Sequence, residues 1–177
     1  MNRFKKFLVG GAAGAVILAS TALPAFAKGP DGAAGKSNMA HLYLYEKNPA
    51  DWSIVDGGAW GKMTYNQSGP TFDYVFNGHG LQPNEKYSLI YYADPWPGNH
   101  PGALIANGTS NAGGNINLNG SKSLGINIPT APDTNTTGGK IWLVLSSDYN
   151  PATNAMTGWN PTSYLFENDL ITYTETP

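Results

Sequence analysis

Two proline-containing loops of this chain each carry a tryptophan beside polar side chains. Trp96 stands in ADPWPG and Trp159 in TGWNPT, in stretches that form neither a helix nor a regular strand. Sugar rings stack on flat aromatic faces, while Asn and Asp side chains hydrogen-bond their hydroxyl groups. A rigid loop loses little entropy on ordering, so it suits a binding site and a structural cover equally well. The two loops therefore predict either a carbohydrate-binding surface or a lid on the core.

Acidic and aromatic side chains follow the two strand patterns from which these loops leave. Asp94 comes directly after the pattern at 87–93, and Asp148 and Tyr149 come directly after the pattern at 140–146. If the two strands run in the same direction, their exits share one rim of the fold. We therefore predict a candidate ligand-binding set of five residues: Trp96, Trp159, Tyr149, Asp94 and Asp148.

Catalytic and metal-binding motifs find little support in the sequence. No two of the histidines His41, His79 and His100 lie at ligand spacing, and no GxSxG motif is present. Carboxylates near strand ends, Glu167 and Asp169 among them, leave open a calcium site and a secreted hydrolase that uses rim carboxylates. We expect no catalytic residues and no cofactor, with calcium as the alternative.

The elements that position these residues are short runs in which apolar and polar residues alternate, the pattern of β-strands. The predicted strands cover 41–46, 59–65, 71–77, 87–93 and 140–146, with one or two more in 164–174 and a hairpin over 103–120. The runs at 87–93 and 140–146 are apolar on both faces and predict central strands. Because Ile141 and Leu143 flank Trp142 on one of them, we expect this indole to fill the core. The pattern predicts an all-β, antiparallel β-sandwich, either immunoglobulin- or fibronectin-like or jelly-roll-like.

The first 27 residues have the pattern of a secretory signal peptide. Arg3, Lys5 and Lys6 form a cationic start, residues 7–23 are apolar and uncharged, and AFA at 25–27 offers the small residues that signal peptidase requires. We expect cleavage before Lys28 and a secreted or cell-surface protein. The Gly- and Ala-rich stretch 28–40 predicts a flexible arm, followed by one β-sandwich domain over 41–177.

Composition narrows the classes of partner. After cleavage, 150 residues would remain with seven Lys, no Arg and twelve acidic residues, a net charge of −5. Such a chain is a poor partner for nucleic acid, and no later apolar run reaches the roughly 18 residues that span a membrane. The absence of cysteine excludes disulfides and thiolate chemistry. Polysaccharides and surface proteins are the expected partners.

One stretch resembles a known family. In LQPNEKYSLIYYA at 81–93, Leu81, Pro83 and Tyr87 match the L-x-P-G-T-x-Y corner of fibronectin type III domains, and Asn84 and Glu85 replace its Gly-Thr pair. The resemblance implies a corner at which the tyrosine hydroxyl bonds back to the backbone. More widely, GAWGKMTYN, FNGHGL, KIWLVLSSDY and GWNPTSYLFENDLITY resemble blocks of small exported archaeal and bacterial β-domain proteins of unassigned function, which implies export but no activity.

Taken together, these patterns predict an exported, non-enzymatic module for extracellular or cell-surface binding, with carbohydrate as the candidate ligand. Two alternatives stay open beside it. One is a self-assembling surface or filament subunit, a homopolymer in which the arm 28–40 adds as a strand to the sheet edge of a neighbouring copy. The other is the secreted hydrolase.

Overall fold

The computed structural model describes residues 37–94 and 102–177 of the chain. The predicted signal peptide, residues 28–36 of the arm and the loop with Trp96 lie outside the described residues. The strands are β1 (Met39–Tyr45), β2 (Trp60–Asn66), β3 (Ser68–Gly69), β4 (Phe72–His79), β5 (Lys86–Tyr92), β6 (Ala103–Thr109), β7 (Ile116–Lys122), β8 (Lys140–Leu145), β9 (Tyr149–Asn150), β10 (Ala155–Met156), β11 (Leu165–Glu167) and β12 (Thr174–Glu175). Two short 3-10 helices, η1 (Ser146–Asp148) and η2 (Pro161–Ser163), complete the elements. The last two residues of the predicted arm belong to β1.

Eight strands form one sheet in the order β6-β5-β8-β11-β1-β2-β4-β7, and all of its neighbouring strands pair antiparallel. The predicted all-β antiparallel fold is confirmed. The segments 87–93 and 140–146, predicted as central strands, correspond to β5 and β8, which are neighbours inside the sheet. In the described part of the chain, no helix is long and apolar enough to cross a membrane.

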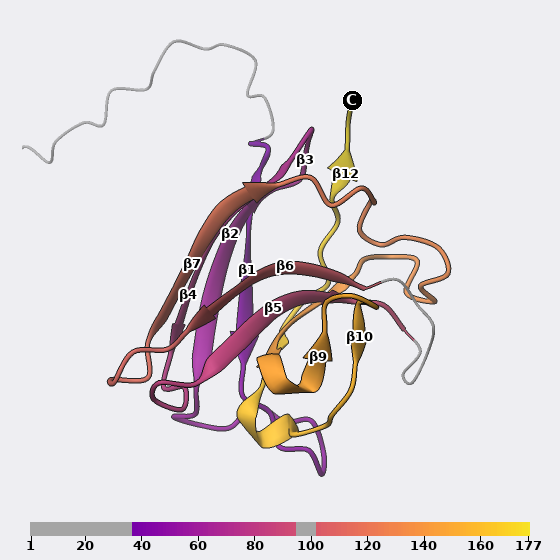
Figure 1. Cartoon of the computed structure of the whole chain (residues 1–177). Helices are drawn as coiled ribbons and strands as arrows, with labels where there is room; N and C mark the ends of the chain where they lie inside the picture. Colours follow the sequence, from indigo (N-terminus) through magenta and orange to yellow (C-terminus); the bar gives the residue numbers. More distant parts are fainter. Residues whose placement is uncertain (1–36, 95–101) are drawn as a thin grey trace, which may run out of the picture. The chain divides into compact units, whose positions relative to one another are not determined.

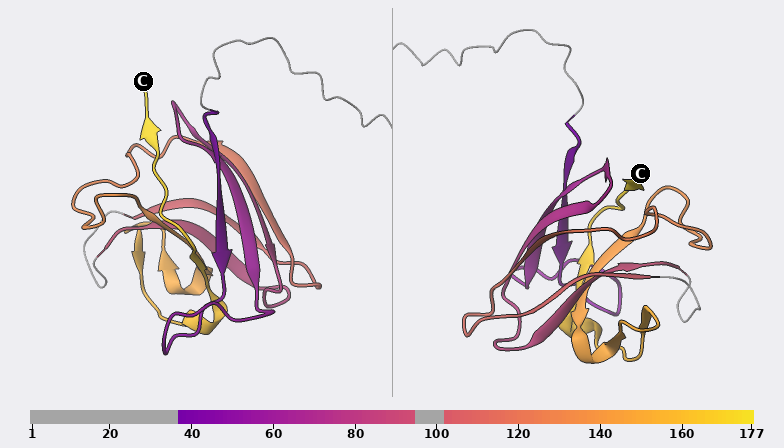
Figure 2. Two further views of the ribbon diagram at one scale, coloured as in Figure 1. Left: turned by 180° about the vertical axis from the view of Figure 1, so that it is seen from behind. Right: turned by 45° about the horizontal axis from the view of Figure 1, so that its top comes forward.

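The sheet curls until its two edge strands approach each other (Figure 1). From β4, the hydroxyl of Tyr74 reaches the carbonyl oxygen of Ile105 on β6 at 3.5 Å. From β7, the ammonium group of Lys122 donates to the carbonyl of Leu104 on β6. A Cβ on Gly108 of β6 would lie 2.6 Å from the end of the Leu118 side chain on β7, which shows how closely the two edge strands approach. Two layers can be seen in the fold, one with β1, β2, β4 and β7 and the other with β5 and β6 (Figure 2). Both are parts of one curled sheet.

Alternating side chains from β1, β2 and β4 fill the inside of the curl. Leu44, Met63, Phe72 and Phe76 are fully buried there, as the period-two patterns predict. Burial of each such side chain stabilises the fold by about 1.5–3 kcal/mol. This inner core holds the sheet in its curled form.

The structure contains the hydrogen bond between the Tyr87 hydroxyl and the backbone that the sequence predicts. The side chain of Tyr87 is buried at the start of β5, and its hydroxyl oxygen accepts from the backbone N–H of Gln82 at 3.2 Å. The buried hydroxyl is thereby paired, and it ties the β4–β5 connection to the strand that follows.

The outer face of β5, β8 and β11 is also buried. The connection from η1 to η2 covers it, and a second apolar cluster forms between them: Ile90, Tyr92, Trp142, Val144, Tyr149, Met156, Tyr164 and Phe166. Trp142 is only 7% exposed, so its predicted burial is confirmed. It belongs, however, to this outer cluster and not to the inner core.

Candidate functional site

A groove opens beside the outer cluster, where the cover formed by residues 146–164 ends. We call it the aromatic groove, and it encloses about 580 Å³. Its walls come from the loop after β1, from β5 and the residues after it, from the connection between β7 and β8, from β8, from the loop before η2 and from β11. The lining residues are Lys47, Trp52, Tyr92, Asp94, Thr134, Lys140, Trp142, Trp159, Phe166 and Glu167.

Three indoles and a phenol form the apolar surface of the groove. Tyr92 and Trp142 come from the paired strands β5 and β8, and their rings stack at 3.9 Å with an interplanar angle of 11°. Trp159 lies 6.0 Å from Trp142 and 6.3 Å from Trp52, tilted by about 50° to each. Trp52 and Trp159 are 49% and 43% exposed. The groove thus offers flat aromatic faces at more than one angle.

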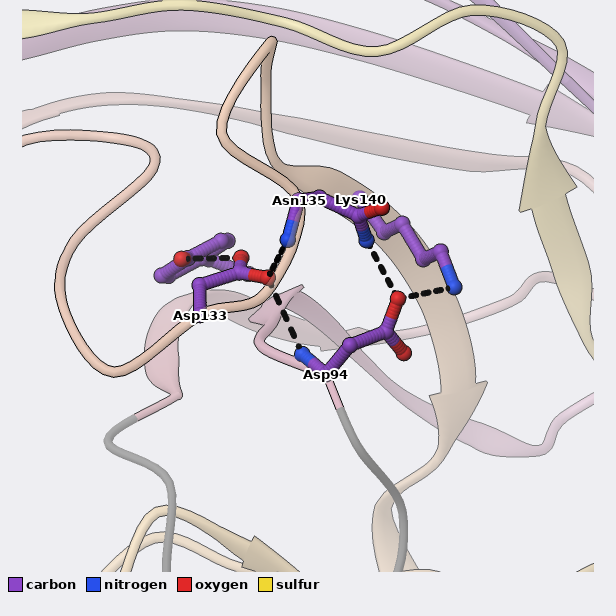
Figure 3. A network of polar contacts seen from close by, with 5 residues as sticks. Asp94, Asp133, Asn135 and Lys140 are labelled. Carbon is purple, nitrogen blue, oxygen red and sulfur yellow. Dashed lines mark hydrogen bonds and ion pairs between the residues drawn. The ribbon is translucent and has the colours of Figure 1, made fainter.

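Asp94 also lines the groove and belongs to a network of polar contacts (Figure 3). Its carboxylate pairs with the ammonium group of Lys140 at 2.5 Å and accepts from the side-chain amide of Asn135. Its backbone N–H donates to buried Asp133 at 3.3 Å, and the Tyr91 hydroxyl donates to the same carboxyl group at 2.6 Å. These bonds fix the loop after β5 and keep the Asp94 carboxylate at the groove.

Glu167 places a second carboxyl group in the groove, in a different setting. Burial against the aromatic side chains raises its pKa to about 7. Its own backbone N–H and the ammonium groups of Lys47 and Lys140 oppose this shift. The Trp142 indole N–H also lies toward the carboxyl group and lowers its pKa, although the pair does not reach ordinary hydrogen-bond geometry. Glu167 therefore titrates near neutral pH.

The structure brings two of the five predicted site residues together. Asp94 and Trp159 line the aromatic groove, whereas Trp96 lies outside the described residues. Asp148 and Tyr149 belong to the covering segment, are buried there and do not line the groove. The prediction of a shared rim is wrong, because β5 and β8 pair antiparallel and the chain therefore leaves them at opposite ends of the sheet. After β8, η1 then leads into the segment that covers the outer face.

Asp148 instead organises the covering segment. Its carboxylate accepts from the hydroxyl of Tyr164 at 2.5 Å and from the side-chain amide of Asn160 at 2.8 Å. The Tyr149 hydroxyl donates to the side chain of Asn154 at 3.0 Å. Asp148 therefore supports the loop that carries Trp159, and Tyr149 fixes the turn between β9 and β10.

Several groove residues were not in the predicted set. Trp52 follows β1 in a tight turn, with its backbone in the left-handed region (φ 61°) that a bulky residue rarely adopts. A large aromatic residue in the polar stretch NPADWS was the sequence signal for it. Glu167 was noted only as a strand-end carboxylate, and nothing in the sequence placed it next to Trp142.

The described histidines are engaged in separate places. The ring of His79 lies 4.7 Å from Trp60, tilted by 36°, and hydrogen-bonds the side chain of Asn115, and His41 hydrogen-bonds Thr64. Within residues 37–94 and 102–177, no three His, Asp or Glu side chains come together as metal ligands.

Comparison of the chain with protein-family models, with curated proteins and with solved structures finds no match.

Proposed function

We propose that this protein is an exported binding module whose aromatic groove binds carbohydrate. The observation that carries the proposal is the meeting of three indoles and Tyr92 with two carboxyl groups and two lysines in one groove. Aromatic faces pack on the apolar faces of sugar rings, and the charged groups hydrogen-bond the hydroxyls. A concave, largely apolar surface with a few fixed polar groups is the usual form of a small-ligand site.

Exposure of the indoles favours binding over a purely structural role. Trp52 and Trp159 leave nearly half of their surface in water, although neighbouring apolar side chains are almost fully buried. Grouped exposed aromatic residues on a folded domain typically mark an interaction surface. The strained backbone at Trp52 agrees with this, because such strain is concentrated at functional positions.

Export rests on the signal pattern of residues 1–27. If it is correct, N-terminal sequencing of the exported protein will begin at Lys28. A secreted chain that retains residues 7–23 would contradict this part of the proposal.

The groove is tested with a panel of soluble polysaccharides: a β-glucan, a mannan, a galactan and a polyuronate. We expect retarded migration of the wild-type protein in a native gel that contains at least one of them. Trp159→Ala should weaken that interaction at least about tenfold, because a central Trp is a typical binding hot spot. Trp60→Ala is the matched control, since Trp60 is 40% exposed but lies outside the groove. Equal loss in both variants, or no retardation by any polysaccharide, would contradict the proposal.

A second candidate function, glycoside hydrolysis, is favoured by the two carboxyl groups in the groove. Glu167 has the raised pKa of a general acid, and Asp94 is paired with Lys140. Release of reducing ends from the same polysaccharides tests it: a hydrolase would release them and Glu167→Gln would stop the release, whereas a binding module releases none.

A further inference from the structure

Two buried polar atoms of the aromatic groove have no hydrogen-bond partner in the described part of the protein. They are the indole nitrogen Nε1 of Trp142 and the carboxyl oxygen Oε2 of Glu167. The Trp142 side chain is 93% buried, and both residues line the groove, so we call this pair the groove floor. Leaving a buried donor or acceptor unpaired is costly, and few such groups persist without a reason.

We infer that the groove floor binds a hydroxyl group of a neutral sugar, which accepts from the Trp142 N–H and donates to the Glu167 carboxylate. The inference rests on the proposed carbohydrate-binding function and narrows it to a ligand class. A hydroxyl is the sugar group with both a donor and acceptor lone pairs on one atom. It can therefore satisfy the indole donor and the carboxylate acceptor at the same time.

The charges of the groove select for a neutral ligand. Lys140 is paired with Asp94, and Lys47 donates to the backbone carbonyl of Glu167 at 2.7 Å. With Glu167 ionised, the groove's two lysines balance its two carboxylates. An anionic sugar at the floor would meet the Glu167 carboxylate and be repelled. A neutral sugar meets a donor and an acceptor.

The bound hydroxyl favours the ionised form of Glu167. If Glu167 carries its own proton, only a neutral carboxyl oxygen is left to accept from the sugar hydroxyl, and the stronger charge-assisted bond is lost. The charged groups that act on this carboxyl group are Lys47, after β1, and Lys140, in β8, with Asp94 after β5 in the same groove. Because burial raises the pKa of Glu167 to about 7 in the free protein, binding must release its proton.

Affinity should therefore fall on acidification. If only the ionised form binds, a pKa of about 7 implies about tenfold weaker binding at pH 6 than at pH 8. At pH 7, binding should release about half a proton per chain, which appears as a difference in calorimetric heat between two buffers of different ionisation enthalpy.

The test is calorimetric titration with the four polysaccharides named above at pH 8 and pH 6. We expect binding of a neutral polysaccharide but not of the polyuronate, and a tenfold loss for the wild type at pH 6. Glu167→Gln should bind about tenfold more weakly at pH 8 and lose the pH dependence. Trp142→Phe should bind more weakly but keep it, because the carboxyl group stays in place. Denaturant midpoints verify that each variant is folded.

The outcomes separate this inference from the proposed function. If Trp159→Ala loses binding but wild-type affinity is the same at both pH values and in Glu167→Gln, the floor inference fails and the groove remains a binding site. Stronger binding at pH 6, or preference for the polyuronate, also overturns the inference. If no polysaccharide binds the wild-type protein, both fail.

Discussion

Asp148 and Glu167 are carboxyl groups on the same outer side of the sheet, yet their surroundings differ. Asp148 accepts hydrogen bonds from Tyr164 and Asn160 on the segment that it organises. In Glu167, Oε2 is buried without a hydrogen-bond partner among the described residues. A carboxylate whose partners are all supplied by the chain fixes a loop, whereas the unpaired Glu167 oxygen is the acceptor that we infer a ligand hydroxyl satisfies.

The aromatic residues divide in the same way. Inside the curled sheet, Phe72 packs edge-on against Tyr173 at 5.0 Å, and the Tyr173 hydroxyl donates to the carbonyl of Gly69 at 2.8 Å. On the outer side, Trp52 and Trp159 meet at a wider angle and remain nearly half exposed. Aromatic content alone therefore does not distinguish the groove from the core; exposure and unpaired polar atoms do.

Removal of the paired carboxylate should have the largest effect on stability. Asp148→Ala leaves the buried Tyr164 hydroxyl without its acceptor and loosens the covering segment, so we expect a loss of about 3 kcal/mol in the free energy of unfolding. Urea denaturation measures it. Asp148→Asn, which keeps an acceptor oxygen, should lose much less, and equal losses would mean that packing and not hydrogen bonding is responsible.

Removal of the unpaired carboxyl group should instead change how stability depends on pH. The pKa of Glu167 is raised from 4.5 to about 7 on folding, so the native state binds more protons than the unfolded state. Stability is therefore greatest at low pH and falls as the pH rises through 7. Between pH 6 and pH 8, the contribution of Glu167 should lower the free energy of unfolding by about 1 kcal/mol. In Glu167→Gln this fall should be absent; a fall of the same size in both proteins would assign it to other groups.

A paired but uncharged polar group should give the smallest effect. Tyr87→Phe removes one hydroxyl and leaves the backbone N–H of Gln82 unpaired, so we expect a loss of about 1 kcal/mol. The shift in denaturant midpoint relative to the wild type checks it. Without any shift, the hydroxyl bond contributes nothing to the corner.

Much of the fold could be predicted because each strand carries its own signal. The alternation in residues 41–46 and 71–77 identified the inward faces of β1 and β4 directly. The order of strands could not be predicted, because β1 pairs with β11 more than 100 residues later and no local pattern encodes that contact.

The site was harder to predict for a related reason. Asp94 and Trp159 could be chosen because a strand end and a proline loop are local features. Trp142 was expected only to fill the core, because β8 is apolar on both faces and the sequence does not say which face the covering segment leaves accessible. The prediction placed Asp148 beside Asp94 because the direction of β8 relative to β5 cannot be read from the sequence; the two strands pair antiparallel, so the residues that follow them lie at opposite ends.

The most direct test of the carbohydrate-binding groove follows the tryptophan indole N–H groups by nuclear magnetic resonance. Each indole signal is assigned with a Trp→Phe variant. Oligosaccharides of the polysaccharide that binds best are added to the wild-type protein. We expect the signals of Trp52, Trp142 and Trp159 to shift together, with Trp142 shifting most because its N–H gains a partner, and the signal of Trp60 to stay in place. A shift at Trp60 with the three groove signals unchanged would contradict the account.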